Sequence, residues 1–206
     1  LGVEPGDRVF IFMERVPELY LAFFGILKVG AVAGPLFSAF GPDPVRDRMQ
    51  DSAAKVLVTQ PDLRRKITPI IRELFELQHI VVVNKNGRDP EPIDYQDLSY
   101  EEEMSKAPSD FKIVNTTEND LSVMHYTSGT TGLPKAAKMS IARVRNMMRS
   151  FISPLEMSAK DRVYITLPLY HGTGGLCAVG IALYTGASIL LREKFSAGRF
   201  WNDCAD

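Results

Sequence analysis

Ten consecutive residues of this chain have the composition of a loop that holds phosphate groups. They directly follow a strand-like run, 121–125. Two glycines leave backbone N–H groups open to an anion, four Ser and Thr hydroxyls add donors, and a lysine adds a mobile positive charge. In order, the residues are Tyr126, Thr127, Ser128, Gly129, Thr130, Thr131, Gly132, Leu133, Pro134 and Lys135.

The spacing of this loop excludes a Walker A motif. A Walker A lysine directly follows a glycine, precedes Ser or Thr and starts a helix. Here Leu133 and Pro134 separate Gly132 from Lys135, and Ala136 follows the lysine. Because a proline disfavours helix at the residue before it, we expect Lys135 to leave extended or turning backbone. The alternative is a surface turn that is merely rich in Gly, Ser and Thr.

A second candidate group lies about forty residues later, where an aromatic residue and a histidine meet three glycines. An imidazole in such a loop could orient a substrate carboxylate, and the alternative is a histidine with a structural role only. No serine stands in a G-x-S-x-G elbow, so a serine hydrolase is not indicated. The residues of this group are Tyr170, His171, Gly172, Gly174 and Gly175.

The elements around both groups predict an α/β fold with layered parallel sheets and flanking helices. Continuous Val, Ile and Phe runs are typical of parallel strands buried on both faces. Helical spacing of apolar residues alternates with these runs. We expect strands over 8–13, 31–37, 55–59, 80–83, 121–126, 162–167 and 187–191, and helices over 19–29, 44–52, 63–77 (interrupted near Pro69), 99–106, 141–151, 176–184 and from 197 onward.

Three segments follow from this pattern. Residues 1–84 form a βαβ sheet portion, 85–120 a polar surface connection, and 121–206 the portion with the phosphate loop and the second candidate group. The acidic cluster at 101–103 is interpreted as a solvated face, since no metal-ligand spacing accompanies it.

Composition narrows the function classes. The chain has 206 residues, 45% of them hydrophobic, and a net charge of −1, which leaves no basic footprint for nucleic acid. Cys177 and Cys204 lack metal-ligand spacing and predict no disulfide, so we expect a reducing, cytoplasmic location. Residues 163–191 lack Asp, Glu, Lys and Arg, but Pro168 and five glycines interrupt them. We expect buried elements there, not a membrane span; peripheral contact with a membrane stays open.

The run 126–135 resembles the signature phosphate loop of the adenylate-forming (AMP-binding) enzymes, which include acyl-CoA synthetases. Pro134 to Ala137 reads Pro-Lys-Ala-Ala where many members have glycine after Pro-Lys, and this form is similar to the fatty acid transport and very-long-chain acyl-CoA synthetase branch. Residues 167–172 and 194–204 agree with that branch. Residues 6–13, 17–20 and 34–37 instead resemble AMP-forming acetyl-CoA synthetases, so the acyl length stays open.

The resemblance implies that residues 1–206 are part of a large N-terminal AMP-binding domain, without the C-terminal domain. It implies an AMP-forming ligase that activates a fatty acid with ATP through an acyl-adenylate and transfers it to CoA. The alternatives are an acetate or short-chain ligase, a carrier-protein adenylation domain and a non-catalytic nucleotide-binding fragment. Because the family's later segments complete the site, we expect this chain alone to be inactive.

The resemblance also assigns residues. The loop from Tyr126 to Lys135 would bind the nucleotide, with Thr127 nearest a Mg²⁺ ion and Lys135 also catalytic. His171 would orient the substrate, beside Tyr170 and the glycines of the second group. The implied partners are a small carboxylic acid, ATP and CoA, and the oligomeric state stays open.

Overall fold

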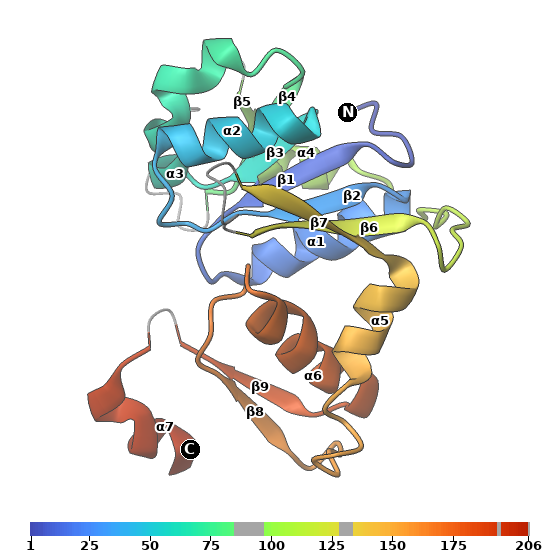
Figure 1. Cartoon of the computed structure of the whole chain (residues 1–206), viewed down its shortest axis with the longest axis vertical. Coiled ribbons are helices and arrows are strands. Elements are labelled where there is room, and N and C mark those ends of the chain that lie inside the picture. Colours follow the sequence, from blue (N-terminus) through green and yellow to red (C-terminus); the bar gives the residue numbers. More distant parts are fainter. Residues whose placement is uncertain (85–96, 128–133, 193–194, 206) are drawn as a thin grey trace. The chain divides into compact units, whose positions relative to one another are not determined.

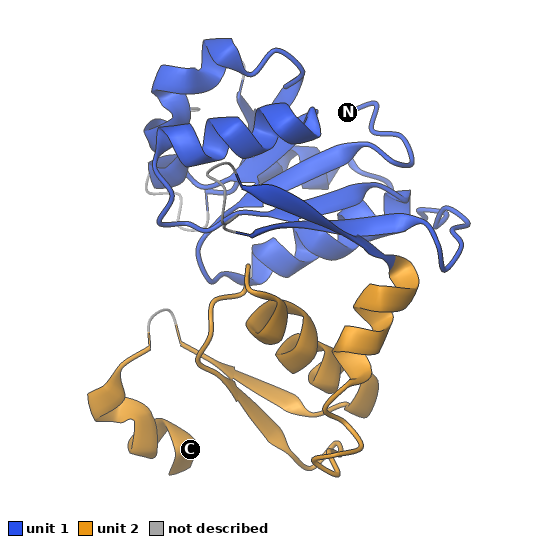
Figure 2. Ribbon diagram, viewed as in Figure 1, with its two compact units in different colours: residues 1–140 blue, residues 141–206 orange. Residues whose placement is uncertain are grey.

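A computed structural model describes residues 1–84, 97–127, 134–192 and 195–205. The chain forms two compact units, residues 1–140 and 141–206 (Figure 2). We describe each unit by itself.

The first unit is built on a seven-stranded sheet with the order β5-β4-β3-β1-β2-β6-β7 (Figure 1). Every neighbouring pair is parallel except β6 and β7, which are antiparallel. The α/β fold class predicted from the sequence is therefore confirmed. The strands are β1 (Arg8–Phe12), β2 (Val32–Pro35), β3 (Val56–Thr59), β4 (His79–Val82), β5 (Asp97–Ser99), β6 (Leu121–Thr127) and β7 (Lys135–Ser140).

Helices cover both faces of this sheet, which explains why its central strands are mostly apolar and buried (Figure 1). On one face, Phe10, Phe12 and Leu57 form a buried cluster with side chains of α2 and α3. On the other face lies α1. The helices are α1 (Pro17–Val29), α2 (Pro42–Ser52), α3 (Pro61–Ile67), the 3₁₀ helix η1 (Thr68–Glu73) and α4 (Tyr100–Lys106).

The helix ends follow local chemistry. Pro17 stands in the first turn of α1, where its missing N–H costs nothing, and Gly30 closes that helix with a left-handed φ of 79°. At the end of α2, Arg8 of β1 donates from Nε to the Ser52 carbonyl at 2.6 Å and from a terminal nitrogen to the Ala53 carbonyl at 2.8 Å. Arg8 therefore binds the last carbonyls of α2 and ties that helix to the sheet.

Two strands were not expected from the sequence. β5 has three residues, too few for a periodic pattern, and β7 begins with Lys-Ala-Ala-Lys, which has no β-branched residue. Pairing with β6 makes β7 a strand, so its tertiary partner overrides its propensity. The expected interruption near Pro69 is confirmed, because α3 ends at Ile67 and a 3₁₀ turn follows.

The second unit contains a parallel pair of strands with helices around it. Its central helix begins as a π-helix four residues earlier than the expected Leu176 and continues as α6, which ends at Gly186. No helix in the described parts of the chain is long and apolar enough to cross a membrane. The elements are α5 (Ile141–Arg149), β8 (Arg162–Ile165), η2 (Gly172–Ala178), α6 (Val179–Thr185), β9 (Ser188–Leu191), η3 (Ala197–Arg199) and α7 (Phe200–Ala205).

Candidate functional site

The β6–β7 hairpin brings the two ends of the predicted phosphate loop together. Thr127 is paired in register with Lys135, and Tyr126 with Ala136. Lys135 therefore starts a strand, which confirms the expectation of extended backbone at this residue. Six predicted site residues lie outside the described residues: Ser128, Gly129, Thr130, Thr131, Gly132 and Leu133.

The two side chains at the mouth of the loop are accessible. Thr127 and Lys135 are both exposed, and no contact within the described parts of the chain occupies the Thr127 hydroxyl or the Lys135 ammonium group. A hydroxyl and a cation thus stand side by side where the chain enters and leaves the loop. This arrangement suits a polyphosphate, and the Thr127 hydroxyl would serve as an oxygen ligand if a Mg²⁺ ion accompanied the phosphates.

Tyr126 is held by contacts with α2 and β1. Its hydroxyl donates to Oδ2 of Asp51 in α2 at 2.6 Å, and the Arg48 carbonyl oxygen lies 3.2 Å away. The ring is half-buried and lies 6.3 Å from the Phe10 ring. Burial raises the pKa of Tyr126, and the hydrogen bond to Asp51 raises it further, so the phenol stays protonated at neutral pH.

Arg48 supports the same contact from within α2. Its guanidinium lies 4.3 Å from the ring centroid of Phe40 and 5.7 Å from that of Tyr126, and one of its terminal nitrogens donates to the Pro44 carbonyl at 2.7 Å. Burial lowers the pKa of Arg48. Asp51 and Arg48 could not be predicted as site residues from the sequence, because their role depends on how α2 crosses the sheet.

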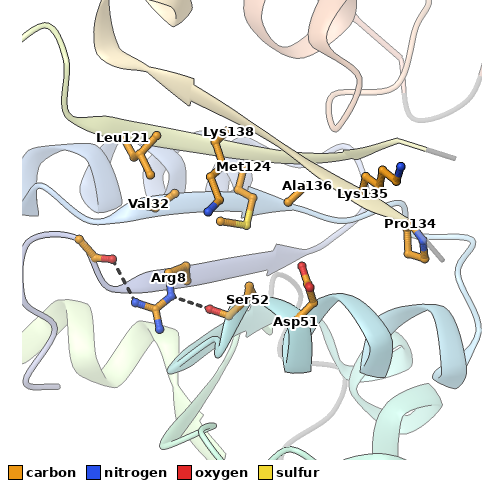
Figure 3. Close-up of a pocket in the computed structure, with 11 residues that line it drawn as sticks. Arg8, Val32, Asp51, Ser52, Leu121, Met124, Pro134, Lys135, Ala136 and Lys138 are labelled. Atoms are coloured by element: carbon orange, nitrogen blue, oxygen red, sulfur yellow. Dashed lines mark hydrogen bonds between the residues drawn. The ribbon is translucent and has the colours of Figure 1, made fainter. Parts of the chain in front are cut away.

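A pocket of about 580 Å³ runs along the sheet beside α2 and ends at the loop (Figure 3). Lys138 lies across Met124 toward Val32, whereas Lys135 stands at the far end beside Pro134 (Figure 3). The guanidinium of Arg8 is already bonded to backbone carbonyls and is structural. The lining residues are Gly6, Arg8, Val32, Asp51, Ser52, Leu121, Met124, Pro134, Lys135, Ala136 and Lys138.

In the second unit, His171 caps the π-helix. Its Nδ1 accepts a hydrogen bond from the Thr173 N–H at 3.3 Å, and its carbonyl accepts one from the Gly175 N–H at 2.7 Å. A neutral imidazole whose Nδ1 accepts carries its proton on Nε2. The exposed ring of His171 thus offers an N–H donor, the group needed to hold a carboxylate.

Gly174 has a packing role in this turn. A Cβ atom at this position would lie 2.6 Å from the Pro168 carbonyl oxygen and 2.9 Å from that of Leu167. Gly174 and Gly175 are buried, while Tyr170 and Gly172 are half-buried. The turn therefore requires glycine at position 174, a residue that the resemblance places near the substrate.

Metal-binding clusters are absent from the described parts of the chain, where no three His, Cys, Asp or Glu side chains gather. Both cysteines are free, Cys177 buried and Cys204 exposed. The phosphate loop lies in the first unit and the His171 turn in the second.

Comparison with known proteins identifies the family. The family model described as AMP-binding enzyme matches residues 1–206. The chain belongs to the AMP-binding enzyme family. The matched stretch includes the β6–β7 hairpin and the His171 turn, and the family assignment made from the loop sequence is confirmed.

Relatives of this AMP-binding chain differ in the acids that their names imply. The chain is 44% identical over 134 residues to acetyl-coenzyme A synthetase of Bacillus subtilis (65% of this chain, 22% of the relative). It is 35% identical over 207 residues to human long-chain fatty acid transport protein 1 (99% of this chain, 32% of the relative). Among solved structures, the inhibitor-bound N-terminal domain of FACL13 from Mycobacterium tuberculosis superposes with a TM-score of 0.83 at 25% identity, covering 98% of this chain and 48% of that one. The chain thus spans a fifth to a third of the length of the curated relatives it matches.

Proposed function

We propose that the whole protein is an AMP-forming acyl-CoA ligase that activates a fatty acid. The observation that carries this proposal is the β6–β7 hairpin, which sets Thr127 opposite Lys135 at the mouth of a loop rich in glycine and hydroxyl groups. The family match and the relatedness to acyl-CoA synthetases support the same reaction class.

The first half-reaction joins two anions. A carboxylate oxygen of the acid attacks the α-phosphorus of ATP, the bond from that phosphorus to the bridging oxygen breaks, and pyrophosphate leaves. Positioning and neutralisation of charge dominate this kind of chemistry. In the proposal, the backbone N–H groups of 129–132 and the hydroxyls of Ser128, Thr130 and Thr131 hold the β- and γ-phosphates.

Lys135 and Thr127 complete the proposed phosphate site. The ammonium group of Lys135 neutralises charge on the departing pyrophosphate, and the Thr127 hydroxyl is the ligand that this chain offers to Mg²⁺, which when bound would neutralise phosphate charge. Both side chains are exposed at the mouth of the loop, as this role requires.

His171 is the proposed orienting group for the acid. Its Nε2–H can donate to the substrate carboxylate and hold one oxygen in place for attack, while its Nδ1 is already engaged by the Thr173 N–H. In the second half-reaction the CoA sulfur attacks the acyl carbon and AMP leaves with the bonding electrons. The reducing, cytoplasmic location expected from the two cysteines suits a thiol acceptor.

A short-chain acid is the second candidate substrate, because the higher identity, 44%, is to an acetyl-coenzyme A synthetase. The fatty acid is preferred because the similarity to the long-chain fatty acid transport protein extends over 99% of this chain. A carrier-protein thiol in place of CoA and a non-catalytic nucleotide-binding role are the remaining alternatives.

An acid panel separates these candidates. ATP–pyrophosphate exchange by the whole protein should depend on an added fatty acid and exceed the exchange with acetate. Exchange that is faster with acetate would indicate a short-chain acid as the substrate. Exchange with none of the acids tested would contradict the ligase proposal.

A further inference from the structure

The strand that leads into the phosphate loop, β6, joins the parallel sheet through β2. β6 is paired with β2 at one register position, Ala33 with Val123, three residues before Tyr126. The backbone N–H groups of Val32 and Leu36 face β1, since they bond to the carbonyls of Asp7 and Ile11. By alternation along the strand, the N–H of residue 35 would face β6.

Residue 35 is a proline, so it has no N–H to donate. The β2–β6 ladder therefore lacks this donor on the side of the loop. Toward the loop from Val123, the register pairs given for β6 are those with β7. A side-chain contact with α2 would add to this pairing in placing the start of the loop.

The Tyr126 side chain supplies a contact at this point. Its hydroxyl donates to the Asp51 carboxylate at 2.6 Å, the length of a charge-assisted O–H···O⁻ hydrogen bond. Its ring lies 6.3 Å from the Phe10 ring of β1 and 5.7 Å from the guanidinium of Arg48 of α2. Helix α2 is itself fixed, because Arg8 binds its last carbonyls and its apolar face is buried against the sheet.

We propose that Tyr126 is a positioning residue, whose hydroxyl, held by Asp51, fixes the mouth of the phosphate loop against α2. This assignment rests on the proposed function for its nucleotide, and it gives Tyr126, which the resemblance places among the nucleotide-binding residues, a role in positioning the loop. We call the Tyr126–Asp51 contact the anchor. Thr127 follows Tyr126 in the chain and Lys135 pairs with Thr127, so the anchor places both groups that would meet the phosphates.

Amide hydrogen exchange of the 206-residue chain tests the anchor without nucleotide. Tyr126→Phe removes one hydroxyl, and Asp51→Ala removes its acceptor. Each should raise exchange in 124–127 and 135–138 by roughly tenfold, the effect of losing one charge-assisted hydrogen bond. Asp51→Asn keeps an acceptor oxygen and should restore part of the protection. Asp43→Ala is the matched control, because Asp43 lies on the same helix, is 74% exposed at its side chain and pairs with Arg46.

MgATP titration of the same variants tests the consequence for binding. Tyr126→Phe and Asp51→Ala should each raise the Kd roughly tenfold, and the double variant should be no weaker than either, since both remove one interaction. Unchanged exchange in the hairpin, or acceleration spread evenly over 1–140, would overturn the anchor, as would unchanged affinity in both variants. If the unmodified chain binds no MgATP, the proposed function fails, and the exchange measurement still decides whether the anchor exists.

Discussion

Arg64 of α3 and Asp97 of β5 form a buried ion pair, with Nε 2.9 Å from Oδ1 and side chains 3% and 1% exposed. Arg64 also donates to the Thr68 hydroxyl at 3.2 Å. The pair joins the edge strand β5, which has only three residues, to the helix that covers its face of the sheet. Edge strands this short need such a tertiary contact, because their own ladder is small.

Removal of one partner of this ion pair should lower the free energy of unfolding. Arg64→Ala leaves the Asp97 charge buried without its guanidinium, and we expect a loss of about 3–5 kcal/mol in the free energy of unfolding. Urea unfolding followed by circular dichroism measures it. Arg65→Ala is the control on the next residue, since Arg65 pairs with the exposed Asp62 and should change stability by less than about 1 kcal/mol. Equal losses in both variants would contradict this account of β5.

The acid sensitivity of the first unit should depend on Asp7. Burial opposes ionisation of this carboxyl, but hydrogen bonds from Lys55 and from the Glu4 N–H outweigh it and hold the pKa of Asp7 below its ordinary value of 3.8. A lowered folded pKa gives stability that is present above the unfolded value and is lost as the pH falls through the folded value. Asp7→Asn should therefore lower stability at pH 7 and flatten its fall below about pH 4.

Unfolding free energies at pH 7, 4 and 3 test this prediction. Asp62→Asn serves as the comparison, because its side chain is 93% exposed. A variant at Asp7 that keeps the steep fall of the unmodified chain would show that another carboxyl controls acid unfolding.

Close packing at Gly174 should make the His171 turn intolerant of a methyl group. Gly174→Ala would place its Cβ 2.6 Å from the Pro168 carbonyl oxygen, and we expect a loss of roughly 1–3 kcal/mol through displaced backbone. Gly198→Ala is the control within the same unit, because nothing lies within 4 Å of its added Cβ. Thermal unfolding of both variants measures this loss. A Gly174→Ala variant as stable as the control would contradict the packing role of Gly174.

The imidazole of His171 should affect the acid more than the nucleotide. In the whole protein, His171→Ala should raise the KM for the carboxylate roughly tenfold, the value of one hydrogen bond to a charged group, and leave the KM for ATP nearly unchanged. His171→Gln retains a side-chain N–H donor and should recover part of the loss. Steady-state kinetics with each substrate varied gives both constants, and an unchanged KM for the acid in His171→Ala would contradict the orienting role.

Much of the fold could be predicted from the sequence because parallel strands carry uninterrupted apolar runs. Phe10 and Leu57 are buried as those runs required. β7 could not be predicted, since Lys135 and Ala136 have no strand propensity and take strand conformation from their partner β6. Pairing across the loop of this hairpin is not encoded in the local sequence of β7 alone.

Part of the candidate site could likewise be predicted from the sequence, and part could not. The phosphate loop was evident because glycine, hydroxyl and lysine chemistry is local in the sequence. The Asp51 carboxylate was not, because it lies 75 residues before Tyr126 and only the crossing of α2 over the sheet brings the two together. For the same reason, the resemblance places Tyr126 among the nucleotide-binding residues but does not indicate its partner on α2.

Isothermal titration of the chain with MgATP tests the central claim, that the loop from Tyr126 to Lys135 binds the phosphates of a nucleotide. The account predicts that a Thr130→Ala/Lys135→Ala double variant loses most of the binding heat, while Lys112→Ala, which removes an exposed lysine outside the loop, binds as the unmodified chain does. Equal heats from the double variant and the unmodified chain would contradict it.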